Sequence, residues 1–143
     1  MADYAGDITP SDAWRILSQD SGAALVDVRS QAEWSFVGLP DLTTLGRKPV
    51  LTAWAHFPGM VANADFLAEL RKGLEAAGHA PGAPVLFLCR SGARSRSAAV
   101  AATAAGIGPA YNVTGGFEGD LDAEGHRGAA GGWKASGLPW RQS

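Results

Sequence analysis

The sequence lacks several features that would assign a class of protein directly. It holds a single cysteine among 143 residues, so an internal disulfide framework is excluded. Its formal net charge is only −2, which gives no global basic field of the kind that attracts nucleic acid. No apolar run approaches the roughly 20 residues that a bilayer-spanning helix requires. We therefore expect neither a nucleic-acid nor a membrane partner, and any attraction for anions must be local.

We also expect no targeting segment, internal repeat or linker in the chain. Residues 1–7 are acidic and have no apolar core, so they do not resemble a signal peptide. A free thiol suits a reducing cytosol, and we expect a cytoplasmic protein. With 46% hydrophobic and 18% charged residues, the composition is that of a globular chain. The length fits one domain over residues 1–143, as a monomer or a homodimer.

Local patterns predict alternating strands and helices. Short apolar runs predict strands over residues 24–28, 49–55, 84–88 and 110–113. Capping residues predict helices that begin beside Thr9, Ser30 and Asn63, and helical composition predicts another over residues 94–105. The glycine-rich residues 115–132 predict a loop before a closing helical turn. Because the strands are apolar on both faces and alternate with helices, we expect an α/β fold with a covered parallel sheet.

The one cysteine stands where a predicted strand meets a predicted helix. Cys89 follows the apolar residues 85–88, and such strand ends are where open α/β sheets bind ligands. The N–H groups and the dipole at the start of the next helix favour negative charge there. Gly92 lets the backbone curl tightly, and Arg90 and Arg94 add positive charge. This combination favours a nucleophilic thiolate and a site for an anionic substrate.

Each residue of this turn also has a structural interpretation. A lone cysteine is most often a small buried hydrophobic residue, although the two neighbouring arginines argue against that here. Arg94 is interpreted as an anion clamp or a brace of the loop, and Arg90 as a side chain at the rim of the cleft. Ser91 and Ser95 either donate hydrogen bonds to the sulfur or cap the helix, and capping is favoured for Ser95. Arg96 is expected to form a salt bridge.

Three segments of the chain resemble the rhodanese-like sulfurtransferase superfamily. Residues 89–95 are similar to its active-site loop, and residues 25–34 are similar to its "D-V-R then E-W" element. Residues 115–117, together with 132–134 and 137–140, are similar to its C-terminal signature. The resemblance implies a three-layer α/β/α fold with a five-stranded, mainly parallel sheet.

The resemblance also implies a reaction in two steps, without a metal or organic cofactor. Cys89 takes a sulfane sulfur from thiosulfate or a similar small anionic donor and becomes a persulfide. The sulfur then passes to cyanide or to a thiol acceptor, which includes a protein thiol. The substrate-binding residues implied by this loop are Arg90, Ser91, Gly92, Ala93, Arg94 and Ser95.

The length of the loop distinguishes two branches that share this chemistry. Four residues lie between Cys89 and Arg94, whereas the related phosphatases and arsenate reductases have five and form a wider cradle. The count therefore favours sulfur transfer. A persulfide carrier or sensor that does not turn over remains an alternative, because carriers use the same loop, and a phosphatase or arsenate reductase is the less favoured one.

Two segments depart from the family pattern. Residues 37–42 lack the histidine that many members have after the "E-W" element. A long charged spacer over residues 117–132 is interpreted as a solvated surface loop, with an acceptor-selecting flap near Cys89 as the alternative. Asp27 and Arg29 are expected to brace the end of the sheet, with Arg29 paired to Glu33, and a direct role in substrate binding is the alternative. Trp34, Trp54 and Met60 are assigned to core packing, with an apolar rim beside the site as the alternative.

Overall fold

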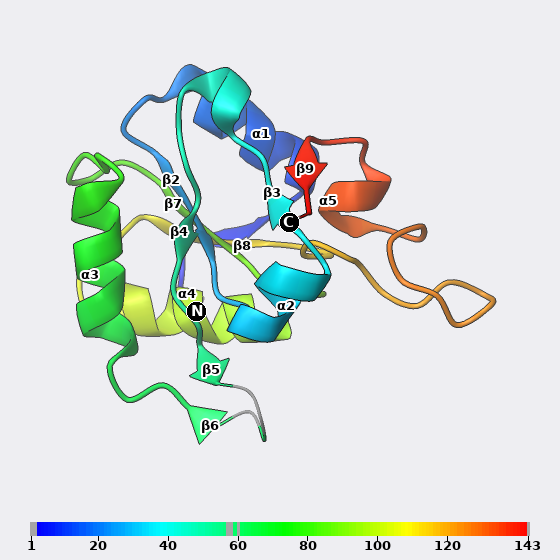
Figure 1. Ribbon diagram of the computed structural model, residues 1–143. Helices are drawn as coiled ribbons and strands as arrows, with labels where there is room; N and C mark the ends of the chain where they lie inside the picture. Colours follow the sequence, from blue (N-terminus) through cyan, green and yellow to red (C-terminus); the bar gives the residue numbers. More distant parts are fainter. Residues whose placement is uncertain (1–2, 57–58, 60, 143) are drawn as a thin grey trace.

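The computed structural model describes residues 3–56, 59 and 61–142. A five-stranded sheet runs through its centre, and neighbouring strands in it are parallel (Figure 1). In spatial order, its strands are β1 (Gly6–Ile8), β8 (Ala110–Val113), β7 (Val85–Leu88), β2 (Ala24–Asp27) and β4 (Val50–Leu51). The helices are α1 (Pro10–Gln19), α2 (Gln31–Phe36), α3 (Phe66–Ala76), α4 (Ala93–Ala104) and α5 (Gly132–Ala135), with a short 3₁₀ turn at Thr43–Leu45.

Helices cover both faces of the sheet. In β7, Val85 and Phe87 join a buried cluster with side chains of α3 and α4. Leu86 and Leu88 point the other way, into a second cluster with side chains of α1 and α5. All four side chains are 0% exposed, as expected for a central strand of a parallel sheet. The three-layer α/β/α class is thereby confirmed.

Capping residues in the sequence correctly predict where the first two helices begin. The Thr9 hydroxyl accepts a hydrogen bond from the Asp12 N–H, and Pro10 occupies the first turn of α1. Ser30 and Glu33 form a reciprocal capping box at the start of α2. These contacts satisfy N–H groups that have no partner inside the helix. They also fix Glu33 on the side of α2 that faces the Cys89 loop.

The region between β4 and α3 differs from the prediction. The strand expected over residues 49–55 ends at Leu51, after which β5 (Ala55–His56) turns away to pair with β6 (Val61–Ala62). Asn63 is not the cap of α3, because the helix begins only at Phe66, with Asp65 at the cap position. The Asn63 side chain donates to the Ala53 carbonyl at 2.9 Å and accepts from the Asp65 N–H at 3.0 Å. Met60 lies outside the described residues.

Three further strands were absent from the prediction. The edge strand β1 pairs with β8 and completes the sheet. Near the C-terminus, β9 (Trp140–Arg141) pairs with β3 (Leu39–Pro40), and α5 forms the expected closing turn. Trp133 of α5 is 0% exposed and donates from its indole N–H to the Pro139 carbonyl at 2.7 Å. The C-terminal segment therefore packs onto the face of the sheet that α1 covers.

Within the part of the chain that the structure describes, no helix is both long and apolar enough to cross a membrane.

Candidate active site

Cys89 lies at the carboxyl end of β7, in the short loop that leads into α4. Its sulfur accepts a hydrogen bond from the Gly92 N–H at 3.1 Å and lies 3.2 Å from the Ser95 hydroxyl oxygen. The residue is free and only 1% exposed. The thiol is therefore held inside the loop, with a main-chain donor directed at it, as a stabilised sulfur anion requires.

Glycine is favoured at position 92 because of its backbone conformation and not because a side chain would lack space. Its φ is +121°, a region that side chains of L-residues rarely adopt. A Cβ built at this position would meet no heavy atom closer than 3.9 Å. A substitution here would therefore strain the backbone and move the N–H group that donates to the sulfur.

Arg94 serves as a brace. Its guanidinium donates two hydrogen bonds to Glu33 of α2, at 2.7 and 2.9 Å, and both side chains are about one-fifth exposed. Burial raises the pKa of Glu33, but the hydrogen bonds and charge of Arg94, with hydrogen bonds from Ser30, outweigh it and lower the pKa to about 2. The ion pair thus fixes the first turn of α4 against α2 (Figure 1).

The predicted pairing of Arg29 with Glu33 is wrong. Arg29 binds Asp27 instead, with an Nη2–Oδ2 distance of 2.6 Å, and neither side chain is exposed. The guanidinium also donates to the Gly38 carbonyl and lies over the Phe117 ring, 4.2 Å from its centroid. Asp27 and Arg29 therefore brace the end of the sheet, as expected, but through each other.

Ser95 also differs from its predicted role. The cap of α4 is Gly92, which makes no side-chain capping bond, and Ser95 lies inside the helix with 0% exposure. Its hydroxyl contacts the Cys89 sulfur and donates to the Asn112 side-chain oxygen at 2.6 Å. Ser95 is thus the hydroxyl that adjoins the sulfur, which was the less favoured of the two predicted roles.

Of the remaining loop residues, Ser91 and Ala93 border a hollow beside the site. Arg90 and Ala93 are exposed, and Ser91 is half-buried. The hollow measures about 220 Å³ and is lined by Ser91, Gly92, Ala93, Arg96, Asn112, Thr114 and Gly115. Within the described residues Arg96 forms no salt bridge, contrary to expectation, and it faces this hollow instead.

The segment that follows β8 is hydrogen-bonded to the backbone of the Cys89 loop. The Phe117 N–H donates to the Cys89 carbonyl at 2.7 Å, and the Glu118 and Gly119 N–H groups donate to the Arg90 carbonyl. Gly116, at φ +60°, makes this approach possible, because a Cβ there would collide with the Cys89 and Arg90 carbonyl oxygens. The paired glycines of the C-terminal signature therefore support the Cys89 loop.

Beyond this contact, residues 119–131 form an arm that projects from the body of the molecule (Figure 1). The arm is closed by its own hydrogen bonds, from the Gly128 N–H to the Glu118 carbonyl and from Arg127 to the Gly119 carbonyl. The hydrogen bonds between this region and the Cys89 loop come from its base. The flap interpretation remains a prediction.

Sequence reasoning missed Asn112 and Asp7. Asn112 is 1% exposed in β8, accepts from Ser95 and donates to the Asp7 carboxylate at 3.0 Å. An amide in an otherwise apolar strand was the available signal, because a buried polar group needs partners. Asp7 gave no such signal, because the strand that carries it was not predicted.

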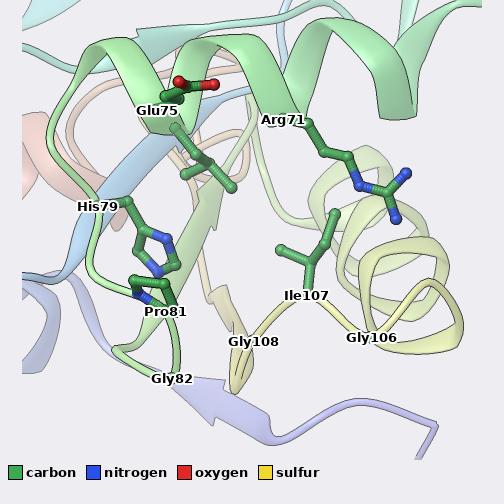
Figure 2. Close-up of a pocket in the computed structure, with 9 residues that line it drawn as sticks. Arg71, Glu75, His79, Pro81, Gly82, Gly106, Ile107 and Gly108 are labelled. Carbon is green, nitrogen blue, oxygen red and sulfur yellow. The ribbon is translucent and has the colours of Figure 1, made fainter.

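A second cavity, of about 340 Å³, lies away from Cys89, between the end of α3 and the loops that precede β7 and β8 (Figure 2). Arg71 and His79 flank Ile107 in this cavity. Arg71 donates to the Ala105 carbonyl, and His79 is bonded to the Ala83 carbonyl, so both side chains already have main-chain partners. None of the residues of the Cys89 loop lines it, and we place the candidate site at Cys89.

The described residues contain no group of three or more His, Cys, Asp or Glu side chains that could hold a metal ion.

Comparisons with known proteins relate this geometry to a family. The family model described as "Rhodanese-like domain" matches residues 9–123. The uncharacterized protein RC0915 of Rickettsia conorii is 34% identical over 134 residues, which cover 94% of this chain and 95% of that protein. The uncharacterized protein RP600 of Rickettsia prowazekii is 32% identical with the same coverage.

Two solved structures are similar to this one. The crystal structure of Rv0390 from M. tuberculosis has a TM-score of 0.88 and 60% identity, and the match covers 98% of this chain and 99% of that one. The solution structure of the polysulfide-sulfur transferase homodimer from Wolinella succinogenes has a TM-score of 0.61 and 24% identity, with coverage of 99% and 81%. At that identity the second likeness shows the fold alone.

Proposed function

The chain belongs to the rhodanese-like domain family, and on that premise we propose that it is a sulfurtransferase that carries sulfur as a persulfide on Cys89. The donor is thiosulfate or another small anion with a transferable sulfur, and the acceptor is cyanide or a thiol. The observation that carries the proposal is the placement of the only thiol at the end of β7, with the Gly92 N–H donating to its sulfur at 3.1 Å. Neither step needs a metal or an organic cofactor.

In the first step, the Cys89 thiolate attacks the outer sulfur of thiosulfate. A sulfur–sulfur bond to Cys89 forms, the bond within thiosulfate breaks, and sulfite leaves with the electron pair. The persulfide anion remains in the loop, where main-chain N–H groups at the start of α4 favour negative charge.

In the second step, cyanide or an acceptor thiolate attacks the outer sulfur of the persulfide. The bond from that sulfur to Cys89 breaks, and Cys89 leaves as a thiolate, ready for the next donor. Because donor and acceptor react in separate steps, the kinetics are expected to be ping-pong.

The loop residues divide between binding and support. Arg90 is an exposed cation next to Cys89 in the chain, which supports a role in holding the anionic end of the donor. Arg94 has both terminal nitrogens bonded to Glu33, which supports a bracing role in place of direct binding. The main chain of residues 91–93 and the Ser95 hydroxyl complete the surroundings of the sulfur.

The test is a mass measurement on the intact protein after exposure to thiosulfate and to other sulfur donors. We expect a gain of one sulfur atom that disappears when cyanide is added, together with turnover of thiosulfate and cyanide. Cys89→Ser serves as the control and gains nothing. Loading without turnover would identify a carrier, hydrolysis of an aryl phosphate would identify a phosphatase, and no loading with any donor overturns the proposal.

A further inference from the structure

A chain of hydrogen bonds, buried at its inner end, leads from the Cys89 sulfur to the edge strand β1. The Ser95 hydroxyl oxygen lies 3.2 Å from the sulfur and 2.6 Å from the Asn112 side-chain oxygen. The Asn112 amide nitrogen donates to Asp7 Oδ1 at 3.0 Å, and the same oxygen accepts from the Tyr4 hydroxyl at 2.9 Å. Ser95 and Asn112 are at most 1% exposed, so water offers them little alternative.

The partners at the outer end determine how the amide is oriented. An ionised carboxylate only accepts hydrogen bonds, so the Asn112 atom that faces Asp7 must be its NH₂ group. The Asn112 oxygen therefore faces Ser95, and it also can only accept. The Gly92 carbonyl, 3.2 Å from the Ser95 hydroxyl, is a third group that only accepts.

The Ser95 hydroxyl has a single proton, and three acceptors lie within reach of it: the Cys89 sulfur, the Asn112 side-chain oxygen and the Gly92 carbonyl. While Cys89 is a thiol, the arrangement is satisfied, because the S–H donates to Ser95 and Ser95 donates to Asn112. Once the sulfur is an anion, it needs the Ser95 hydroxyl proton, which is already donated to the Asn112 side-chain oxygen. If the proton moves to the sulfur, a buried amide oxygen loses its donor, and such a loss is costly.

Resting on the proposed function, we propose that Asn112, oriented by Asp7, is a positioning residue that withholds the Ser95 proton from the Cys89 sulfur anion. The thiolate and the persulfide are then held mainly by main-chain N–H groups. A sulfur anion with one donor fewer is a stronger nucleophile, because the nucleophilicity of sulfur rises with its basicity. Asn112 thereby favours rapid transfer over tight stabilisation of the anion.

Other charged groups near the sulfur interact with it electrostatically, without a hydrogen bond through Ser95. Arg94 interacts electrostatically with both Cys89 and Asp27. The charged or titratable groups on the loop and on the elements packed against it are Arg90, Arg94, Arg96, Glu33, Asp27, Arg29, Glu118, Lys134, Tyr4 and Asp7. Of these groups, the test variants change only Asp7. Measuring the Asp7 variant with and without Ser95→Ala separates the effect of the Asp7 charge from the effect of its hydrogen bond to Asn112.

The test is the rate of alkylation of Cys89 by iodoacetamide as a function of pH, since it requires no sulfur donor. In Asn112→Leu the proton is free to serve the thiolate, so the midpoint of the profile is expected to fall by about one pH unit, the size of one hydrogen bond to an anion. The plateau rate is expected to fall about threefold, because the stabilised thiolate is less nucleophilic. In Ser95→Ala, adding Asn112→Leu is expected to change neither value.

Asp7→Asn provides a second route, because Asp7 is exposed and the change is isosteric. An amide at position 7 allows Asn112 to turn its NH₂ towards Ser95, so the midpoint is again expected to fall, and only in the presence of Ser95. Asp3→Asn removes a charge from the same exposed segment and is the matched control.

An unchanged or raised midpoint in a folded Asn112→Leu protein overturns the proposal. Equal shifts for Asp7→Asn with and without Ser95 also overturn it, because they would show an effect of charge alone. Failure of persulfide loading would instead count against the proposed function, since alkylation reports on the thiol in either case.

Discussion

The two arginine–carboxylate pairs beside Cys89 differ in burial and in separation along the chain. Asp27 and Arg29 are two residues apart and fully buried, whereas Glu33 and Arg94 are 61 residues apart and about one-fifth exposed. The first pair fixes the end of β2 and supports Phe117, and the second joins α2 to α4. The difference indicates that the two pairs have different roles: the buried pair stabilises the sheet, and the long-range pair positions the Cys89 loop.

Breaking the buried pair should have the largest effect. Asp27→Asn leaves the Arg29 guanidinium charged and without its partner at 0% exposure, and such losses typically cost about 3–5 kcal/mol. We expect that decrease in the free energy of unfolding, measured by urea denaturation. Asp12→Asn, which breaks the exposed pair with Arg15, is the control and should change stability by less than about 0.5 kcal/mol. Similar losses in the two variants would contradict the assigned role of burial.

Breaking the long-range pair should affect the reaction more than the fold. Glu33→Gln keeps the shape of the side chain but removes the charge that Arg94 binds, and partial exposure limits the loss of stability to about 1–2 kcal/mol. Because the first turn of α4 carries the loop, we expect sulfur transfer to slow by about tenfold or more.

Steady-state kinetics with thiosulfate and cyanide, alongside urea denaturation, measure the two effects of Glu33→Gln. Arg94→Lys is the matched variant on the other side of the pair, because it keeps the charge and loses the two-pronged bond. A full transfer rate in both variants would show that the ion pair does not position the loop.

The Glu33–Arg94 pair makes part of the free energy of unfolding depend on pH. The pKa of Glu33 falls from 4.5 to about 2 in the folded protein, so its contribution is present above about pH 4.5 and is lost as the pH falls from 4.5 towards 2. The stability difference between wild type and Glu33→Gln should therefore shrink over that window. Thermal unfolding at pH values from 2 to 6 measures it, and a difference that stays constant would refute the assigned pKa shift.

The same two pairs show what the sequence could predict and what it could not. Arg29 was assigned to Glu33 because the two lie close in sequence, yet the choice between Asp27 and Glu33 depends on how β2 leads into α2. Arg94 could not be paired with Glu33 in advance, because only the folded arrangement brings α2 beside α4. By contrast, the Cys89 turn was predictable, since an apolar strand, a glycine and a helix-forming run follow each other directly.

The missed elements have a similar explanation. The edge strand β1 has three residues, Gly6–Ile8, of which one is apolar, so it carries no periodic signal. Its importance lies in Asp7, which the parallel pairing with β8 places beside Asn112. The number of strands came from the family resemblance and not from the pattern, and for that reason the partner of Asn112 stayed hidden.

The arm over residues 119–131 should show the smallest effect on stability. Gly119 and Gly132 lie so close that a Cβ on Gly132 would be 2.7 Å from the Gly119 nitrogen, so the two ends of the arm almost meet. Replacing residues 120–130 with one glycine should therefore close the chain without strain, and we expect a change in stability within about 0.5 kcal/mol. Urea denaturation measures this change.

The same replacement separates the two interpretations of the arm. Its base donates hydrogen bonds to the Arg90 carbonyl, and those donors, Glu118 and Gly119, remain in the shortened chain. The reaction with cyanide, which is small, should then keep its rate within about twofold, because the loop that holds the sulfur is unchanged. If the arm selects acceptors, KM should rise for larger thiols and protein thiols but not for cyanide. Unchanged kinetics with every acceptor would show that the arm is only a surface loop. The selection of acceptors would then depend on the Cys89 loop itself.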